Sequence, residues 1–246
     1  MDTTKRVTKI TYNGVSLPLG GGTPDPTDPV YVYKTQRNAE WLNMLGTGYG
    51  ENYDEMESYY DTADNEIRLL FHLTPPADNL IAFNVTTSSG KYNVSYYDKN
   101  DNLISVDVNS NTKFEANLMY DNFKHEMSDG TRQVLIVITP TTIGSNLRTF
   151  IPATNSLKTS PSNYMNWTVV EMMGKTTSGT KITPSDSDSV NRQFRNLEFY
   201  TLFGTNLVTD MQWMFRFCPS LIAIPQLDTS SVTNMQNMFY YCYSLT

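Results

Sequence analysis

A stretch of 17 residues near the end of the chain occurs twice, and this repeat limits the possible folds more than any other feature. Residues 205–221 align with residues 229–245, which places the two copies 24 residues apart. Ten residues are identical in register, namely Thr, Val, Thr, Met, Gln, Met, Phe, Cys, Ser and Leu. A fixed period of roughly 20–29 residues is typical of solenoids, in which similar units stack and bury a shared core. We therefore expect residues 145–246 to form a solenoid, with fainter and less regular units before the two clear ones.

Within each copy the apolar residues are three or four positions apart, as on one face of a helix. In the first copy these residues are Val208, Met211, Met214, Phe215, Cys218 and Leu221. Residues 221–224 then have the pattern of a short strand that ends before Pro225. The sequence therefore predicts units made of a short helix and a strand. The sequence stops within a unit, so we expect the solenoid to continue or to be capped by a partner, since its last apolar face is otherwise exposed.

The first 19 residues have the pattern of a β-hairpin. An Asn-Gly pair at residues 13–14 separates two runs of alternating apolar residues, and Asn-Gly favours the type I′ turn of a two-residue hairpin loop. An isolated hairpin is marginally stable in water. We therefore predict that residues 1–19 anchor the chain to a partner through Val7, Ile10, Tyr12, Val15 and Leu17. Residues 20–29 contain three glycines and three prolines and are predicted to be a linker.

Residues 30–144 alternate between short apolar runs and turn residues, which is typical of a β-sandwich. Strands are expected at 30–34, 66–73, 79–86, 91–97, 103–108 and 132–139, with a short helix at 37–45. Asp98, Asn100, Asp101 and Asn102 carry oxygen ligands of the kind that calcium loops use, but a tight turn favours the same residue types. The expected fold class is mainly β, with a sandwich followed by a leucine-rich-repeat solenoid.

The charge and the motifs exclude several functions. Lysine and arginine number 18 against 25 acidic residues, giving a net charge of −7, whereas binding to nucleic acid or to an anionic membrane requires a basic surface. No catalytic motif is present, so we expect no enzyme, no catalytic residue, no metal site and no cofactor. The first seven residues lack the apolar run of a signal peptide, so we expect no export by that route, and no apolar run is long enough to span a membrane.

The second copy of the repeat resembles the BspA-type leucine-rich repeats of bacterial surface proteins. Their pattern is approximately D-T-S-x-V-T-N-M-x-x-M-F-x-x-C-x-S-L, and residues 228–245 follow it almost throughout. The first copy departs from it at Asn206, Leu207 and Asp210. Residues 92–97 and 132–140 resemble, more weakly, phage tail-fibre-like proteins in which a PKD-like or Ig-like β-sandwich precedes such repeats. The opening residues 7–17 resemble N-terminal segments of phage fibre proteins.

The resemblance implies attachment, without catalytic residues. Cellular BspA-type adhesins are exported, whereas virion proteins assemble in the host cytoplasm and need no export signal. We therefore expect a bacteriophage virion structural protein of tail-fibre type, bound to other tail or capsid proteins through its N-terminus and forming a homo-oligomer. Three alternatives remain: a bacterial cell-surface adhesin with BspA-like repeats, a phage head fibre or capsid decoration protein, and a glycan-degrading enzyme, for which no pattern in the sequence places the pair of carboxylates.

Five aromatic residues of the repeats are candidates for a binding surface. Most of these residues lie off the apolar stripe, where aromatic side chains suit stacking on sugar rings or anchoring to a protein. They are Trp213, Phe217, Tyr240, Tyr241 and Tyr243. The alternative is that these rings pack between units or subunits. The expected ligand is a glycan or protein of the host cell surface. Cys218 and Cys242 occupy equivalent positions, and we expect small core residues rather than a disulfide.

Overall fold

The computed structural model of the chain is mainly β. It describes residues 9–12, 15–18, 65–74, 79–124, 126–127, 129–153, 169–176, 179–185, 194–203, 208–222, 224, 227 and 229–245. Within these ranges the regular elements are twelve strands and one short 3-10 helix, η1 (Tyr120–Asn122). No helix in the described part of the chain is long and apolar enough to cross a membrane.

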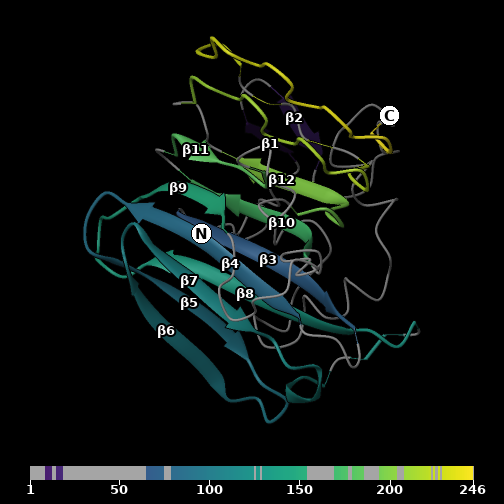
Figure 1. Cartoon of the computed structure of the whole chain (residues 1–246). Coiled ribbons are helices and arrows are strands. Elements are labelled where there is room, and N and C mark those ends of the chain that lie inside the picture. Colours follow the sequence, from purple (N-terminus) through teal and green to yellow (C-terminus); the bar gives the residue numbers. More distant parts are fainter. Residues whose placement is uncertain are drawn as a thin grey trace, which may run out of the picture.

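Two sheets share the core of the molecule (Figure 1). The first has six strands in the order β12 (Phe199–Phe203), β10 (Val169–Lys175), β3 (Glu66–Leu73), β8 (Arg132–Pro140), β5 (Lys91–Tyr97) and β6 (Leu103–Asn109). The second has four strands in the order β11 (Lys181–Ile182), β9 (Leu147–Pro152), β4 (Leu80–Thr87) and β7 (Thr112–Asn117). Neighbouring strands are antiparallel except for the pairs β10–β12 and β11–β9, which are parallel.

Alternate residues of the strands fill the space between the two sheets. On β3, Ile67, Leu69 and Phe71 are fully buried and belong to the common core. On β4 the central residue is Phe83, whose ring centroid lies 5.1 Å from that of Phe114 and 5.1 Å from that of Phe150. A period of two along a strand sends every second side chain to the same face, so the apolar alternation of the sequence directly produces this core.

Two buried tyrosines join the sheets by hydrogen bonds. The hydroxyl of Tyr92 on β5 donates to the carbonyl of Thr112 on β7 at 2.7 Å. The hydroxyl of Tyr200 on β12 donates to the carbonyl of Ile182 on β11 at 3.0 Å. Burial raises the pKa of both phenols, so both stay protonated and able to donate at neutral pH. Each bond also satisfies a hydroxyl that is otherwise costly to bury.

Most of the strands expected for the middle of the chain are confirmed. The predicted ranges 66–73 and 91–97 agree with β3 and β5. Strands β6 and β8 each extend one residue beyond the expected range, and β4 is shifted by one residue at both ends. The predicted strand at 30–34, the helix at 37–45 and the linker at 20–29 lie outside the described residues. The sequence missed β7 and β9, because Thr112–Asn117 is mostly polar and Leu147–Pro152 was assigned to the solenoid.

The N-terminal hairpin is present in the backbone. Strands β1 (Lys9–Tyr12) and β2 (Val15–Pro18) pair antiparallel, with Tyr12 opposite Val15 and Ile10 opposite Leu17. The predicted Asn-Gly turn at residues 13–14 lies outside the described residues. Val7 lies outside the described residues. The role of this hairpin as an anchor stays a prediction.

The sheets continue past residue 144, where the sequence analysis placed the start of the solenoid. Strands β9, β10, β11 and β12 come from this later part of the chain, and they add to both sheets. The two copies of the repeat then follow β12 and lie beyond its edge of the six-stranded sheet, at the opposite end from β5 and β6 (Figure 1). The N–H of Ile222, which follows the first copy, donates to the carbonyl of Glu198 beside β12 at 2.9 Å. The division at residues 144 and 145 stays a prediction, but it does not separate the two sheets.

A carboxyl group is buried on the outer face of the six-stranded sheet. Glu171 on β10 is opposite Leu70 on β3 and is fully buried. Burial raises the pKa of this carboxyl well above its ordinary value of 4.5, and the nearby Glu198 raises it further. Burial also raises the pKa of Glu198. In the unfolded chain both groups ionise more easily than in the folded chain, so ionisation favours unfolding.

We predict that the protein loses stability as the pH rises above about 4.5, through the range in which Glu171 ionises. Replacing this residue by glutamine (Glu171→Gln) removes the ionisable group, so the variant should lose less stability between about pH 5 and about pH 8 than the parent chain. The free energy of unfolding measured in urea at both pH values tests this. The matched control is Asp121→Asn, which removes an exposed carboxyl. Equal pH dependence of Glu171→Gln and the parent would contradict the prediction.

Candidate binding surface

The repeat forms consecutive turns, and the short helix that its apolar spacing predicts is absent. Residues 212–217 and 236–241 are turns in both copies. The reason is a left-handed backbone conformation at two positions of each copy, where a helix needs φ near −63°. The φ angles are 62° at Trp213 and 57° at Phe217, then 55° at Asn237 and 64° at Tyr241, exactly one period later in the chain. The strand expected at 221–224 is likewise absent at its described residues.

The apolar spacing nevertheless identified the buried face. Met211, Met214, Phe215 and Cys218 are all buried in the core cluster that also contains residues of the two sheets. Consecutive turns place every third or fourth residue on one side of the chain, much as a helix does. A helix and a series of turns therefore give the same apolar spacing, and the sequence pattern alone does not separate them.

Hydrogen bonds between the two copies fix their register. The N–H groups of Met211, Trp213, Phe215 and Phe217 donate to carbonyls of the second copy, at distances of 2.8, 3.1, 2.9 and 2.9 Å. The acceptors are the carbonyls of Asn234, Gln236, Met238 and Tyr240. The side chain of Gln212 also donates to that of Gln236 at 3.0 Å. The two copies are therefore stacked as equivalent units, and we call them the first and the second repeat unit.

The second repeat unit brings the predicted aromatic residues together on one surface. Phe217 stacks on Tyr241, with ring centroids 4.9 Å apart and planes 18° apart. Tyr240 meets Tyr241 edge to face at 4.4 Å, and Tyr243 meets Tyr241 edge to face at 5.3 Å. Contacts of this geometry are favourable for aromatic pairs. Tyr241 is thus the centre of the group.

Arg216 is the member of this surface that the sequence analysis missed. Its guanidinium carbon lies 4.9 Å from the ring centre of Phe217, 5.2 Å from that of Tyr240 and 6.0 Å from that of Trp213. Arg216 is the positional equivalent of Tyr240 in the first unit, so the periodicity of the repeat gave a signal for its location. We call Trp213, Arg216, Phe217, Tyr240, Tyr241 and Tyr243 the aromatic cluster.

The aromatic cluster is partly packed and partly exposed. Trp213, Arg216 and Phe217 are half-buried, which agrees with packing between the units. Tyr240 and Tyr241 are exposed, and Tyr243 exposes 73% of its surface. A side-chain hydrogen bond with Tyr241 raises the pKa of Tyr240, so this phenol is protonated at neutral pH. The surface therefore offers tyrosine rings, phenol hydroxyls and one guanidinium to a ligand, while its inner half is held by the repeat.

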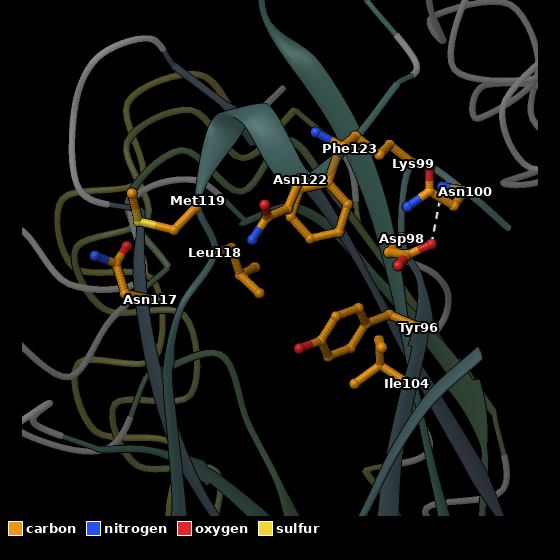
Figure 2. A pocket seen from close by; sticks show the side chains of 10 residues that line it. All are labelled: Tyr96, Asp98, Lys99, Asn100, Ile104, Asn117, Leu118, Met119, Asn122 and Phe123. Carbon is orange, nitrogen blue, oxygen red and sulfur yellow. Dashed lines mark hydrogen bonds between the residues drawn. The ribbon is translucent and has the colours of Figure 1, made fainter. Parts of the chain in front are cut away.

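A second candidate site is a cavity of about 280 Å³ between the β5–β6 turn and the segment after β7. Figure 2 shows Tyr96, Leu118 and Phe123 around this space, with Asp98 at its rim. The carboxylate of Asp98 already accepts from the N–H groups of Asn100 and Asn102, at 2.8 and 2.9 Å, and from the side chain of Asn102 at 3.0 Å. These bonds hold the pKa of Asp98 below its ordinary value, and the bond from the Asn102 side chain has the largest effect. This carboxylate stabilises the turn, as the turn interpretation of 98–102 predicts.

The two cysteines are free thiols. Cys218 is buried in the core, and burial raises the pKa of its thiol well above the ordinary range. Burial raises the pKa of Cys242 to about 11, and its Sγ donates to the carbonyl of Phe215 at 3.0 Å. Both thiols are therefore unreactive at neutral pH and act as small core residues. Across the described part of the chain, no three His, Cys, Asp or Glu side chains are grouped closely enough to hold a metal ion.

Comparison with known proteins gives no relative from which a site could be transferred. No protein family, curated protein or solved structure matches this chain. The function proposed below therefore depends on the repeat motif and on the surface that the repeat builds.

We predict that Asn237→Val weakens the docking of the second repeat unit, whereas Asn237→Gly does not. The φ of 55° suits asparagine and glycine, but a β-branched residue is strained there by roughly 1–2 kcal/mol. The N–H of Phe215, which bonds to the carbonyl of Met238 in the second unit, reports on docking. Its hydrogen exchange should be about tenfold faster in Asn237→Val, since about 1.4 kcal/mol is a factor of ten. Equal exchange rates in the two variants would show that this backbone conformation is not needed.

Proposed function

We propose that this chain is a bacteriophage virion structural protein of tail-fibre type, in which the N-terminal hairpin anchors the chain and a leucine-rich-repeat solenoid provides attachment to the host surface. The observation that carries the proposal is the aromatic cluster, which is exposed on one side and held by the repeat on the other. The resemblance of residues 228–245 to BspA-type repeats supports the same role.

The chemistry of the aromatic cluster favours a glycan as the ligand. Tyrosine presents a large apolar ring with a hydroxyl at its edge, so it can stack on a sugar ring and also form a hydrogen bond. Arg216 adds hydrogen-bond donors among the rings of Phe217 and Tyr240. The first unit and the lateral hydrogen bonds hold the backbone of these residues, so little conformational entropy is lost on binding. Several copies on one virion would add avidity to a weak single interaction.

The binding proposal is tested with two variants and a matched control. Tyr243→Ala and Tyr240→Ala should each weaken binding to bacterial surface polysaccharides by about tenfold or more, which corresponds to about 1.4 kcal/mol. The melting temperature should stay nearly unchanged, because exposed side chains contribute little to stability. Ile143→Ala removes a fully exposed apolar side chain of the sandwich and should leave binding unchanged. Binding is measured on an array of purified polysaccharides, and full binding by both tyrosine variants would contradict the proposal.

The virion assignment is tested by the location of the protein. Particles purified from an infected culture by density gradient should contain peptides of this chain when analysed by mass spectrometry. Peptides found only in the bacterial envelope or the medium would instead support the adhesin. Deletion of residues 1–22 should abolish incorporation into particles, because it removes the hairpin. Incorporation of the truncated chain would show that the hairpin is not the anchor.

A further inference from the structure

The outer edge of the second repeat unit presents a row of backbone donors. In the first unit, Met211, Trp213, Phe215 and Phe217 donate their N–H groups to the second unit. The N–H groups of Met214, Arg216 and Cys218 donate within the unit to the carbonyl three positions back, as from Met214 to Met211. The N–H of Gln212 donates to the carboxylate of Asp210. The second unit repeats this internal pattern, with Met238 donating to Met235, Tyr240 to Asn237 and Cys242 to Phe239. The N–H groups of Met235, Asn237, Phe239 and Tyr241 are thus the equivalents of the four lateral donors, and among the described residues they have no acceptor.

The same edge also exposes apolar side chains that are buried in the first unit. Met211 is 1% exposed, whereas its equivalent Met235 is 47% exposed. Phe215 is fully buried, whereas its equivalent Phe239 is 41% exposed. The ring of Phe239 stacks on Phe215 with centroids 5.6 Å apart and planes 4° apart, so the opposite face of that ring is left for another partner. Burial of the first unit therefore depends on a neighbour that the second unit lacks within the described structure.

We propose that this edge, residues 235–241, is a docking surface for a further unit of the same repeat. Such a unit offers four carbonyls in the arrangement of Asn234, Gln236, Met238 and Tyr240, which already satisfy the lateral donors of the first unit. It also offers an aromatic ring in the position of Phe239. The edge includes Tyr240 and Tyr241 of the aromatic cluster, whose equivalents in the first unit, Arg216 and Phe217, are half-buried. A docked unit would therefore cover part of both tyrosines and leave Tyr243 as the most exposed ring.

The row of N–H donors along this edge determines which kind of partner fits it. A second copy related by a two-fold axis would place a row of N–H donors against another row of N–H donors. A second copy in head-to-tail order would need the opposite edge of the first unit, but that region already contacts the sandwich. There Thr183 donates from Oγ1 to the carbonyl of Met214 at 2.8 Å. The edge of an ordinary β-strand presents both N–H and C=O groups, so it satisfies only some of the donors. A unit of the same repeat provides acceptors at all four positions.

The test joins a copy of residues 223–246 to the C-terminus, which keeps the 24-residue period. Hydrogen exchange of the amides of Met235, Asn237, Phe239 and Tyr241 is compared with that in the parent chain. All four should exchange at least about tenfold more slowly in the extended chain, because they gain acceptors and a cover. The matched control carries the same 24 residues in scrambled order and should leave the four rates unchanged. The amides of Met214 and Cys218 bond within the first unit, so their protection in all three chains shows that this unit is folded.

Two outcomes would overturn the proposal. The first is unchanged exchange at the four amides in the extended chain, with Met214 and Cys218 protected. The second is slow exchange at these amides already in the parent chain together with a dimer in solution, which would show that a second copy covers the edge. Neither outcome bears on the polysaccharide array, so failure of this proposal and failure of the attachment role are distinguishable.

Discussion

One apolar core extends from the two sheets into the first repeat unit, and the rest of the structure depends on this continuity. Phe150 on β9 contacts Phe194 at 5.9 Å, and Tyr200 on β12 meets Phe215 edge to face at 4.9 Å. The hydroxyl of Tyr200 also ties β12 to β11. The sheets therefore fix the first unit, and the first unit fixes the second through lateral hydrogen bonds. A pair of units without the sheets would lack the sheet residues, such as Tyr200, that share the core with Met211 and Phe215.

The sandwich could be predicted from the sequence where one face of a strand is strongly apolar. Residues 66–73 and 91–97 were located to the residue, because turn residues bound each run and tertiary packing agrees with the local pattern. Strand β7 was missed because only Phe114 and Ala116 are apolar in Thr112–Asn117, and the strand forms mainly through pairing with β4. Pairing partners distant in sequence are not visible in a single chain, which also explains why β9 to β12 were assigned to the solenoid.

The 24-residue period of the repeat predicted which residues are equivalent, but it did not predict their backbone conformation. The 24-residue offset correctly identified equivalent positions, since it relates the left-handed residues, the hydrogen bonds within each unit and the stacked rings of the two units. It did not reveal the local backbone, because apolar spacing of three and four residues fits both a helix and successive turns. Asn237 was the available signal, since asparagine tolerates a left-handed conformation better than most residues. The left-handed conformation could not be predicted at Trp213, Phe217 or Tyr241, because aromatic residues rarely adopt it.

The aromatic residues in left-handed positions are not explained by folding stability. A left-handed conformation costs a non-glycine residue about 1–2 kcal/mol, which applies to Phe217 and to Tyr241. Their ring contact contributes about 0.5–1.5 kcal/mol, and the hydrogen bond from Phe217 to Tyr240 contributes a similar amount, so these contacts offset most but not all of the cost of the two residues. The second unit has asparagine at its first left-handed position and tyrosine at its second. Since asparagine would hold that backbone at lower cost, we attribute the tyrosine to the binding role proposed for its exposed ring. The guanidinium of Arg216, which lies close to the rings of Phe217 and Tyr240, belongs to the same surface.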